Sequence, residues 1–212
     1  MHTLATQIDQ LNQDLFSQLP QEVLEAFEQS IEEIKTKNIE EISIRTGDLM
    51  PEFSLPNVFG RTIHSKDILK NGKMIMAFYR GSWCPYCHLE LRFLQDHLSE
   101  IKAKNAVLLA ISPQGPDHSL SMIEKNNLKF EVLTDHNNEF AKKLGIVFQL
   151  QDFVLSHYQN LGIRLSDFNN NEENSLPVPA VFVVDENKMV TYKFLDVNYM
   201  NRLNVEELIQ AL

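Results

Sequence analysis

Cysteine is scarce in this sequence, with only Cys84 and Cys87 among 212 residues. A structural zinc site needs four ligands. Because there is no second cysteine pair, His64, His118 and His136 would have to complete such a site. Long apolar runs are also missing, since none approaches the roughly 18 residues of a membrane-spanning helix. We therefore expect no membrane partner, and zinc remains open only if the fold gathers those histidines.

The sequence also has fewer positively than negatively charged residues. The chain carries 19 Lys and Arg against 29 Asp and Glu, a net charge of -10, and no basic cluster offers a surface for phosphates. We therefore expect no nucleic-acid partner. The opening residues, MHTLATQIDQLNQDLF, lack the basic and unbroken apolar segments of a secretory signal. The expected location is a reducing cytoplasm, where a disulfide is more often transient and catalytic than structural.

Residues 1–45 predict an acidic helical extension, with nine acidic and three basic residues. Apolar residues recur every three or four positions, as on one face of a helix. They form two sets separated by Pro20: Leu4, Ile8, Leu11, Leu15 and Leu19, then Leu24, Phe27, Ile31 and Ile34. The helices either pack on their own chain, or pack on a symmetry mate and so form a homodimer, with the glutamates in solvent. Alternatively, they form an arm that recognises a partner protein.

Residues 46–212 have the pattern of an α/β domain. Short apolar runs predict central strands buried on both faces at 74–79, 106–112, 130–134 and 180–184. Helical patterns lie at 84–104, 116–127 and 137–144, the last ending at Gly145. A turn at 185–187 leads to an antiparallel strand at 189–195, and Asn204 is the expected N-cap of a closing helix.

This order of elements predicts a thioredoxin-like fold, in which helices flank a central mixed sheet. A hairpin at 53–65 precedes the sheet. One segment, at about 149–177, is an insertion into the fold. Its FNNNEEN run at 168–174 is polar and favours turns, so we expect the insertion on the surface.

Both cysteines lie in the stretch FYRGSWCPYCHLE, at a junction between a strand and a helix. Pro85 suits the first helical position, which makes Cys84 the N-cap, its sulfur facing the free amide hydrogens and the positive end of the helix. Such a setting can lower a cysteine pKa from about 8.5 to roughly 3.5–7.5. Cys87 returns to the same face one turn later, within reach of a reversible disulfide.

Three other interpretations of the cysteine pair stay open at this point. Two buried cysteines can simply pack as small apolar residues, or they can contribute to a zinc site. The run Cys84-Pro-Tyr-Cys87-His88 also satisfies the c-type haem attachment pattern. Against haem stand the missing export signal, the α/β context, and the place of His88 in the first turn of an amphipathic helix.

Several stretches resemble the peroxiredoxin, or AhpC/TSA, family over residues 46–212. GDLMPEFSL at 47–55 is similar to the family signature G-x-x-A-P-D-F-x-L, and AISPQ at 110–114 and FAKKLG at 140–145 resemble a later strand and helix. The FYRGSWCPYC box at 78–87 is most similar to a bacterial peroxiredoxin-like group with the box F-Y-R-G-x-W-C-P-Y-C.

The resemblance implies a thiol-dependent peroxidase that reduces hydrogen peroxide or organic hydroperoxides. Cys84 would attack the peroxide and become a sulfenic acid, and Cys87 would condense with it to form a disulfide. Thioredoxin or a similar dithiol would then reduce that disulfide. No flavin, haem, metal or other cofactor is implied.

The site departs from the family at two positions, since Gly81 replaces a threonine and Pro179 replaces an arginine that normally orient peroxide. Arg80 is either the substitute positive charge or a surface arginine paired with a carboxylate. Ser82 either donates a hydrogen bond in place of the threonine or supports the turn. Gly81 would let the turn pass close to the substrate.

Two other features of the sequence resemble thioredoxins instead. Trp83 precedes the first cysteine, and Val178-Pro179-Ala180 is similar to the segment that carries the cis-proline of thioredoxins. The alternative functions are therefore a thiol-disulfide oxidoreductase acting on protein disulfides, or a non-catalytic redox-sensing or binding module.

Overall fold

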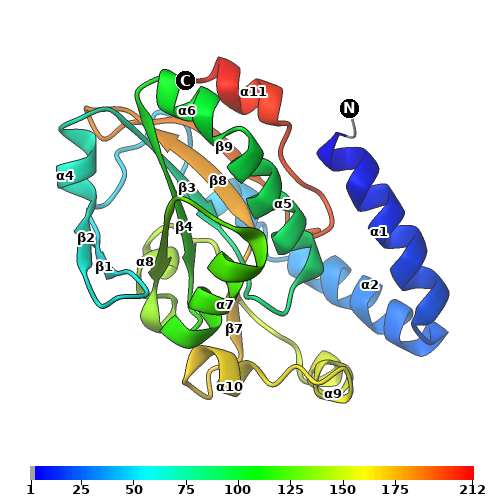
Figure 1. Ribbon diagram of the computed structural model, residues 1–212. Helices are drawn as coiled ribbons and strands as arrows, with labels where there is room; N and C mark the ends of the chain where they lie inside the picture. Colours follow the sequence, from blue (N-terminus) through cyan, green and yellow to red (C-terminus); the bar gives the residue numbers. More distant parts are fainter. Residues whose placement is uncertain (1–2) are drawn as a thin grey trace.

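The computed structural model describes residues 3–212. A five-stranded mixed sheet lies at its centre (Figure 1). Its strand order is β5-β4-β3-β8-β9. β3, β4 and β5 are parallel, whereas β8 is antiparallel to both β3 and β9. The strands are β3 (Lys73–Phe78), β4 (Ala106–Ser112), β5 (Glu131–Thr134), β8 (Ala180–Val184) and β9 (Val190–Leu195). All five predicted strands are confirmed, as is a central mixed sheet.

Helices cover both faces of this sheet, because successive side chains of a strand point to opposite faces. Ile75 and Ala77 of β3 lie in one apolar core, and Met74 and Met76 lie in the other. The first core is covered by α5 (Pro85–Asp96), α6 (Leu98–Ala103), α7 (Pro116–Asn126) and α11 (Val205–Gln210). The second is covered by α4 (Ser65–Leu69), α8 (Glu139–Lys143) and the predicted hairpin of β1 (Ser54–Pro56) and β2 (Thr62–His64).

The helix ends follow their local sequence signals. α8, which follows the short 3-10 turn η1 (His136–Asn138), ends at Lys143 with Leu144 as its C-cap, and the next residue, Gly145, has φ +71°. This is the left-handed conformation that glycine adopts at a helix C-terminus. The Asn204 side chain caps α11 by accepting from the amides of Glu206 and Glu207. The single helix expected at 84–104 is wrong in one respect, since His97 leaves helical geometry and separates α5 from α6.

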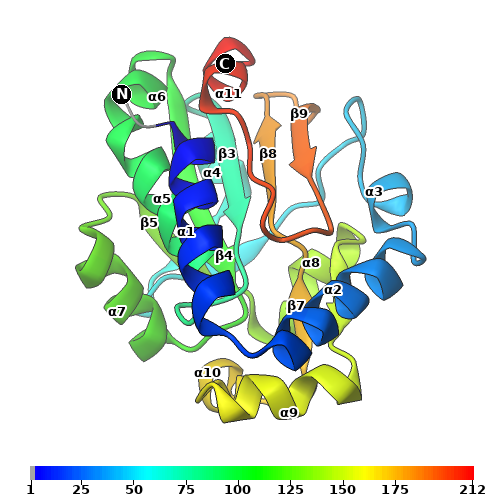
Figure 2. The same ribbon diagram turned by 90° about the vertical axis from the view of Figure 1, so that its right-hand side faces the viewer.

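The N-terminal helices pack on their own chain. They are α1 (Leu4–Gln18) and α2 (Gln21–Lys35), followed by the short α3 (Ile39–Ile42). Figure 2 shows α1 alongside α5 and α2 alongside α9 (Asp152–Asn160). Leu4 and Ile8 of α1 join the first core, and Ile34 of α2 joins a third.

This third core corrects the expectation that the 149–177 insertion lies on the surface. The insertion contains α9, α10 (Leu165–Asn169) and β7 (Ser175–Pro177), which pairs antiparallel with β6 (Val147–Gln149). Val154 and Tyr158 are four residues apart on α9, so they share one face, and both are buried together with Leu165. An amphipathic helix therefore closes this side of the molecule.

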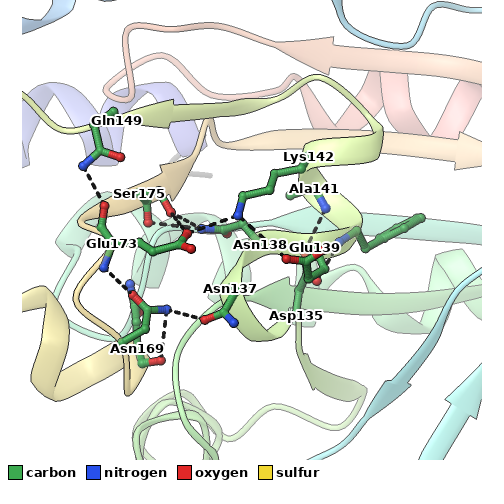
Figure 3. A network of polar contacts seen from close by, with 12 residues as sticks. Asp135, Asn137, Asn138, Glu139, Ala141, Lys142, Gln149, Asn169, Glu173 and Ser175 are labelled. Atoms are coloured by element: carbon green, nitrogen blue, oxygen red, sulfur yellow. Dashed lines mark hydrogen bonds and ion pairs between the residues drawn. The ribbon is translucent and has the colours of Figure 1, made fainter.

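Polar contacts fix the polar end of the insertion to the core domain (Figure 3). The Asn138 side-chain amide donates to the carbonyl and the hydroxyl of Ser175, each at 3.1 Å, and Lys142 pairs with Glu173 at 3.1 Å. The carboxylate of Asp135 accepts from two backbone amides at the start of α8. These contacts hold β7, and hence the start of β8, in place.

Candidate active site

The two cysteines lie where β3 passes into α5. Cys84 is the N-cap of α5 and Pro85 its first residue, as predicted. The sulfur of Cys84, however, makes no hydrogen bond to the helix amides. It is directed instead toward two side chains, those of Arg80 and Cys87. The expectation that the amides hold the sulfur is therefore wrong.

Cys87 lies one helical turn later, and its sulfur donates to that of Cys84 at 2.8 Å. A disulfide would bring the sulfurs to about 2.05 Å, so the pair is a dithiol in contact, and both cysteines are free. Each is fully buried. The pair can close to a disulfide with a small movement.

Arg80 supplies a buried positive charge beside Cys84. Its Nη2 lies 3.3 Å from the Cys84 sulfur, and its Nη1 donates to the Tyr158 hydroxyl at 3.1 Å. The guanidinium also lies over two rings, 3.7 Å from the centroid of Tyr199 and 5.0 Å from that of Trp83. Arg80 is only 3% exposed and has no carboxylate partner among residues 3–212. The surface-arginine interpretation is therefore wrong.

The surroundings of the dithiol shift the pKa values of its two thiols in opposite directions. Burial raises the pKa of Cys84, but the hydrogen bond from Cys87 and the charges of Arg80 and Arg202 outweigh it, so that the pKa lies well below its ordinary value. Burial and the neighbouring Cys84 raise the pKa of Cys87 well above its ordinary value. Cys84 is consequently the more acidic thiol of the pair, and Cys87 is the one that donates a hydrogen bond to it.

The turn between Arg80 and Cys84 is held by the backbone of Ser82. The side-chain oxygen of Ser82 bonds to no described residue; instead its backbone amide donates to Gln114 and its carbonyl accepts from His88, both at 2.7 Å. A Cβ on Gly81 would clash with the indole nitrogen of Trp83. Gly81 thus leaves room for the indole ring. Ser82 supports the turn.

Pro179 lies at the same end of the sheet as this turn, because Ala180 of β8 pairs with Phe78 of β3. It is buried. There is no cis peptide bond within residues 3–212, so Pro179 is trans. The likeness to the thioredoxin cis-proline segment therefore does not extend to its backbone geometry.

A second buried arginine was missed by sequence reasoning. Nη1 of Arg202 lies 3.1 Å from the Glu90 carboxylate and its Nη2 lies 3.7 Å from the Cys87 sulfur, with both charged side chains only 1% exposed. Burial raises the pKa of Glu90, against the opposing charge of Arg202. The sequence gives no signal for this contact, because 115 positions separate Arg202 from Cys87. Glu90 is thus the buried partner of Arg202 and not a solvent-exposed residue of α5.

A groove of about 780 Å³ opens beside the dithiol. α1, α2, α9 and the 198–200 loop line it, and Arg80, Trp83 and Pro85 lie on the side of the cysteines. Most of the other lining side chains are apolar: Leu15, Phe16, Leu19, Leu24, Phe27, Ile31, Leu161 and Ile163. The N-terminal helices and the insertion therefore form a largely apolar approach to the Arg80 side of the site.

Comparison with known proteins fits this geometry. The model of the AhpC/TSA family matches residues 46–193. The chain belongs to the AhpC/TSA family. One relative, the putative peroxiredoxin bcp of Buchnera aphidicola, is 33% identical over 104 residues, 49% of this chain and 65% of the relative. The chain thus spans just under two thirds of that protein. The putative peroxiredoxin bcp of Haemophilus influenzae is 27% identical over 76% of this chain and 98% of its own length.

The fold is shared with solved structures. Reduced Prx3 of Vibrio vulnificus, in complex with hydrogen peroxide, superposes with a TM-score of 0.63 over 79% of this chain and 98% of that one, at 16% identity. The predicted thioredoxin-like fold is confirmed.

The described residues were also compared with what a membrane-spanning helix and a metal site require. Within residues 3–212 no helix combines the length and apolar character that crossing a bilayer requires. The same residues hold no group of three or more His, Cys, Asp and Glu side chains arranged to bind a metal ion. The histidines considered for zinc are thus not gathered around the cysteine pair.

Proposed function

We propose that this protein is a thiol-dependent peroxidase in which Cys84 attacks the peroxide and Cys87 resolves the product. The observation that carries the proposal is the buried contact of Arg80 with Cys84 at 3.3 Å, next to a thiol only 2.8 Å away. A buried guanidinium stabilises both the attacking thiolate and the charge that develops on the departing oxygen. Family membership supports the same activity.

In the oxidative half of the reaction, every covalent bond between heavy atoms that forms or breaks belongs to the two cysteines or the peroxide. The Cys84 thiolate attacks the terminal oxygen of a hydroperoxide and the O–O bond breaks. The alkoxide that departs takes up a proton, and Cys84 is left as a sulfenic acid. The Cys87 sulfur, as a thiolate, then attacks the Cys84 sulfur, so that the disulfide forms and hydroxide leaves to become water. A dithiol reductant restores the pair by exchange.

Arg80 takes over the charge that the family normally draws from elsewhere. Pro179 stands where an arginine is usual, and Gly81 stands where a threonine is usual. The Arg80 guanidinium is held on one side by Tyr158 and lies over the Tyr199 ring. A guanidinium fixed in this way is already oriented before the peroxide arrives, so binding costs little reorganisation.

The groove supports organic hydroperoxides over hydrogen peroxide as substrates. Its walls offer apolar surface to an alkyl or aryl chain, and Arg80 lies where the peroxide group would reach the site. Residues 1–45 would then be an extension of a peroxidase domain at 46–212, since the extension supplies much of the wall. The family match, which begins at residue 46, supports that division.

For the partners, we propose thioredoxin or a similar dithiol as the reductant and a reducing cytoplasm as the location, because a pair that cycles through a disulfide needs a continuous supply of reductant. A homodimer stays a prediction, which sedimentation of the reduced protein would test.

Steady-state turnover with thioredoxin tests the proposed function. We expect consumption of hydroperoxide by the wild type, none by Cys84→Ser, and loss of thioredoxin-coupled recycling in Cys87→Ser. Turnover by Cys84→Ser would exclude Cys84 as the nucleophile. Rapid reduction of a protein disulfide by a wild type that is inert to peroxide would favour the thiol-disulfide oxidoreductase instead. Inertness in both assays would favour a binding module.

A further inference from the structure

The dithiol and three buried charged side chains around it form one charge cluster. Arg80 and Arg202 are cations, Glu90 is an anion, and Cys84 and Cys87 share one proton between their sulfurs. With Cys84 as a thiolate, two positive and two negative charges balance. A net charge buried in low dielectric is costly, so this balance stabilises the reduced state.

Oxidation of Cys84 upsets the balance. When peroxide converts the thiolate into a neutral sulfenic acid, one negative charge leaves the cluster with the alkoxide. Two guanidinium groups then face the single carboxylate of Glu90. The cluster regains neutrality if Cys87 gives up its proton to the departing alkoxide, directly or through water.

Arg202 is placed to stabilise that second thiolate. Its Nη2 is 3.7 Å from the Cys87 sulfur, and its Nη1 is held at 3.1 Å by Glu90, which lies one turn beyond Cys87 on α5. Arg80, in contrast, contacts the sulfur of Cys84. Each cysteine therefore has its own guanidinium.

We propose that Arg202, held by Glu90, stabilises the Cys87 thiolate once Cys84 has become a sulfenic acid, so that the negative charge passes from one sulfur to the other within a turnover. This inference rests on the proposed peroxidase function. Arg202 touches a reacting sulfur and is a catalytic residue, whereas Glu90 is a positioning residue.

A titration of Cys87 in the Cys84→Ser background tests the inference without peroxide. The serine hydroxyl is neutral, as a sulfenic acid is. Since Cys87 is fully buried, its ionisation is followed by the ultraviolet absorbance of the thiolate, with no alkylating probe. The other groups that act on Cys87 are Arg80 before α5, Tyr79 at the end of β3 and Tyr158 on α9. All three stay unchanged.

The two members of the pair are expected to act in opposite directions. In Cys84→Ser, adding Arg202→Met should raise the midpoint of Cys87 ionisation by about one pH unit or more, and Arg202→Lys should restore most of the loss. Adding Glu90→Gln, whose side-chain oxygen still accepts from Arg202 and holds it in place, should lower the midpoint, because a negative charge is removed while the positioning is kept. A purely structural role of the pair would not give shifts of opposite sign.

A second pair of variants covers the case in which Arg202→Met does not fold. If Arg202→Met leaves Glu90 unpaired and the protein unfolds, Arg202→Met with Glu90→Gln is compared with Glu90→Gln alone, and thermal melts verify folding. Equal midpoints with and without Arg202 overturn the inference.

Single-turnover kinetics then test Arg202→Met in a protein that keeps both cysteines. They show whether the effect on Cys87 ionisation also appears in the rate of disulfide formation. Arg202→Met should slow disulfide formation about tenfold at neutral pH and affect sulfenic acid formation less. Equal slowing of both phases would contradict a specific role at Cys87. If the wild type forms no sulfenic acid at all, the peroxidase proposal fails, while the titration still reports the effect of Arg202 on Cys87.

Discussion

Within residues 3–212 the guanidinium of Arg80 has no carboxylate partner, and the sulfur that it contacts is that of Cys84. The guanidinium is buried, its nearest anionic group is the sulfur of Cys84 at 3.3 Å, and the rings of Tyr199 and Trp83 shield it from water. A charged arginine in such a place stabilises the thiolate far more than an exposed one, because solvent does not screen the interaction. The reactivity of Cys84 therefore depends on Arg80 more than on the helix end.

Replacing Arg80 by methionine tests this dependence through pH. In the wild type, the lowered pKa of Cys84 keeps the thiolate formed at neutral pH, so the oxidation rate should be constant there and fall as acid protonates Cys84. In Arg80→Met the pKa rises, and the rate at neutral pH should drop at least about tenfold and then increase about tenfold per pH unit up to the new pKa. Stopped-flow fluorescence of Trp83 measures both profiles.

The matched control is Arg61→Met. This arginine pairs with Glu131 at the surface, where its side chain is 66% exposed, and its loss should leave the pH profile unchanged. An unchanged profile in Arg80→Met would remove Arg80 from the mechanism.

The sequence predicted those site residues that lie close together along the chain. Cys84, Cys87 and Arg80 lie within eight consecutive positions, so one strand and one helix start suffice to bring them together. Arg202 and Tyr158 reach the same site from remote parts of the chain. A single sequence contains no periodicity or spacing that links such residues, so only the tertiary structure reveals them.

Tyr158 lies on α9, and Arg202 lies in the loop just before α11. The stability of α11 therefore matters for the position of Arg202. α11 follows Arg202 directly and buries Val205 and Leu208 in the first core. Its first turn is capped by Asn204, which accepts from two backbone amides. The loop that carries Arg202 is thus fixed at its far end by a capped helix.

Removal of that cap should lower stability measurably. Asn204→Ala leaves two amides of α11 without their partner, which costs about 1 kcal/mol and should reduce the Tm by roughly 2–4 °C in a chain of this size. Differential scanning calorimetry measures the change. Gln210→Ala, at an exposed position of the same helix, should leave the Tm within about 1 °C. Equal Tm values for the two variants would contradict the capping account.

Sequence patterns were most reliable for the elements that follow simple rules. Apolar runs gave the strands, Pro20 separated the two N-terminal helices, and Gly145 ended α8. The 149–177 insertion was misplaced because polar residues dominate one part of it. The buried face of α9 consists of few residues, such as Val154 and Tyr158, and so short a stripe is easily overlooked.

Across the whole molecule, helices outside the stretch matched by the AhpC/TSA family cover the dithiol. α1 lies along α5, where the Tyr86 hydroxyl donates to the Asn12 side chain at 2.6 Å, and α2 lies along α9. Between these helices the apolar groove leads to Arg80. The N-terminal extension should therefore influence which hydroperoxides react.

A substitution in the groove tests this influence. Phe16 lines the groove and is 48% exposed, so Phe16→Gln should fold normally. We expect the kcat/KM for a bulky aryl hydroperoxide to fall about three- to tenfold, since apolar contact is lost, with little change for hydrogen peroxide. Phe59→Gln, at the tip of the β1–β2 hairpin and 82% exposed, is the control. An equal effect on both peroxides would mean that the groove does not bind the organic part.

The most direct test of the central claim, that Cys84 is a thiolate nucleophile resolved by Cys87, is single-turnover oxidation. Reduced protein is mixed with an equimolar organic hydroperoxide, followed by Trp83 fluorescence, quenched and weighed by mass spectrometry. We predict rapid loss of two hydrogen atoms in the wild type, gain of one oxygen atom in Cys87→Ser, and no rapid change in Cys84→Ser. Oxidation of the wild type no faster than that of a free thiol, or an oxygen atom gained at Cys87 in Cys84→Ser at the wild-type rate, would contradict the account.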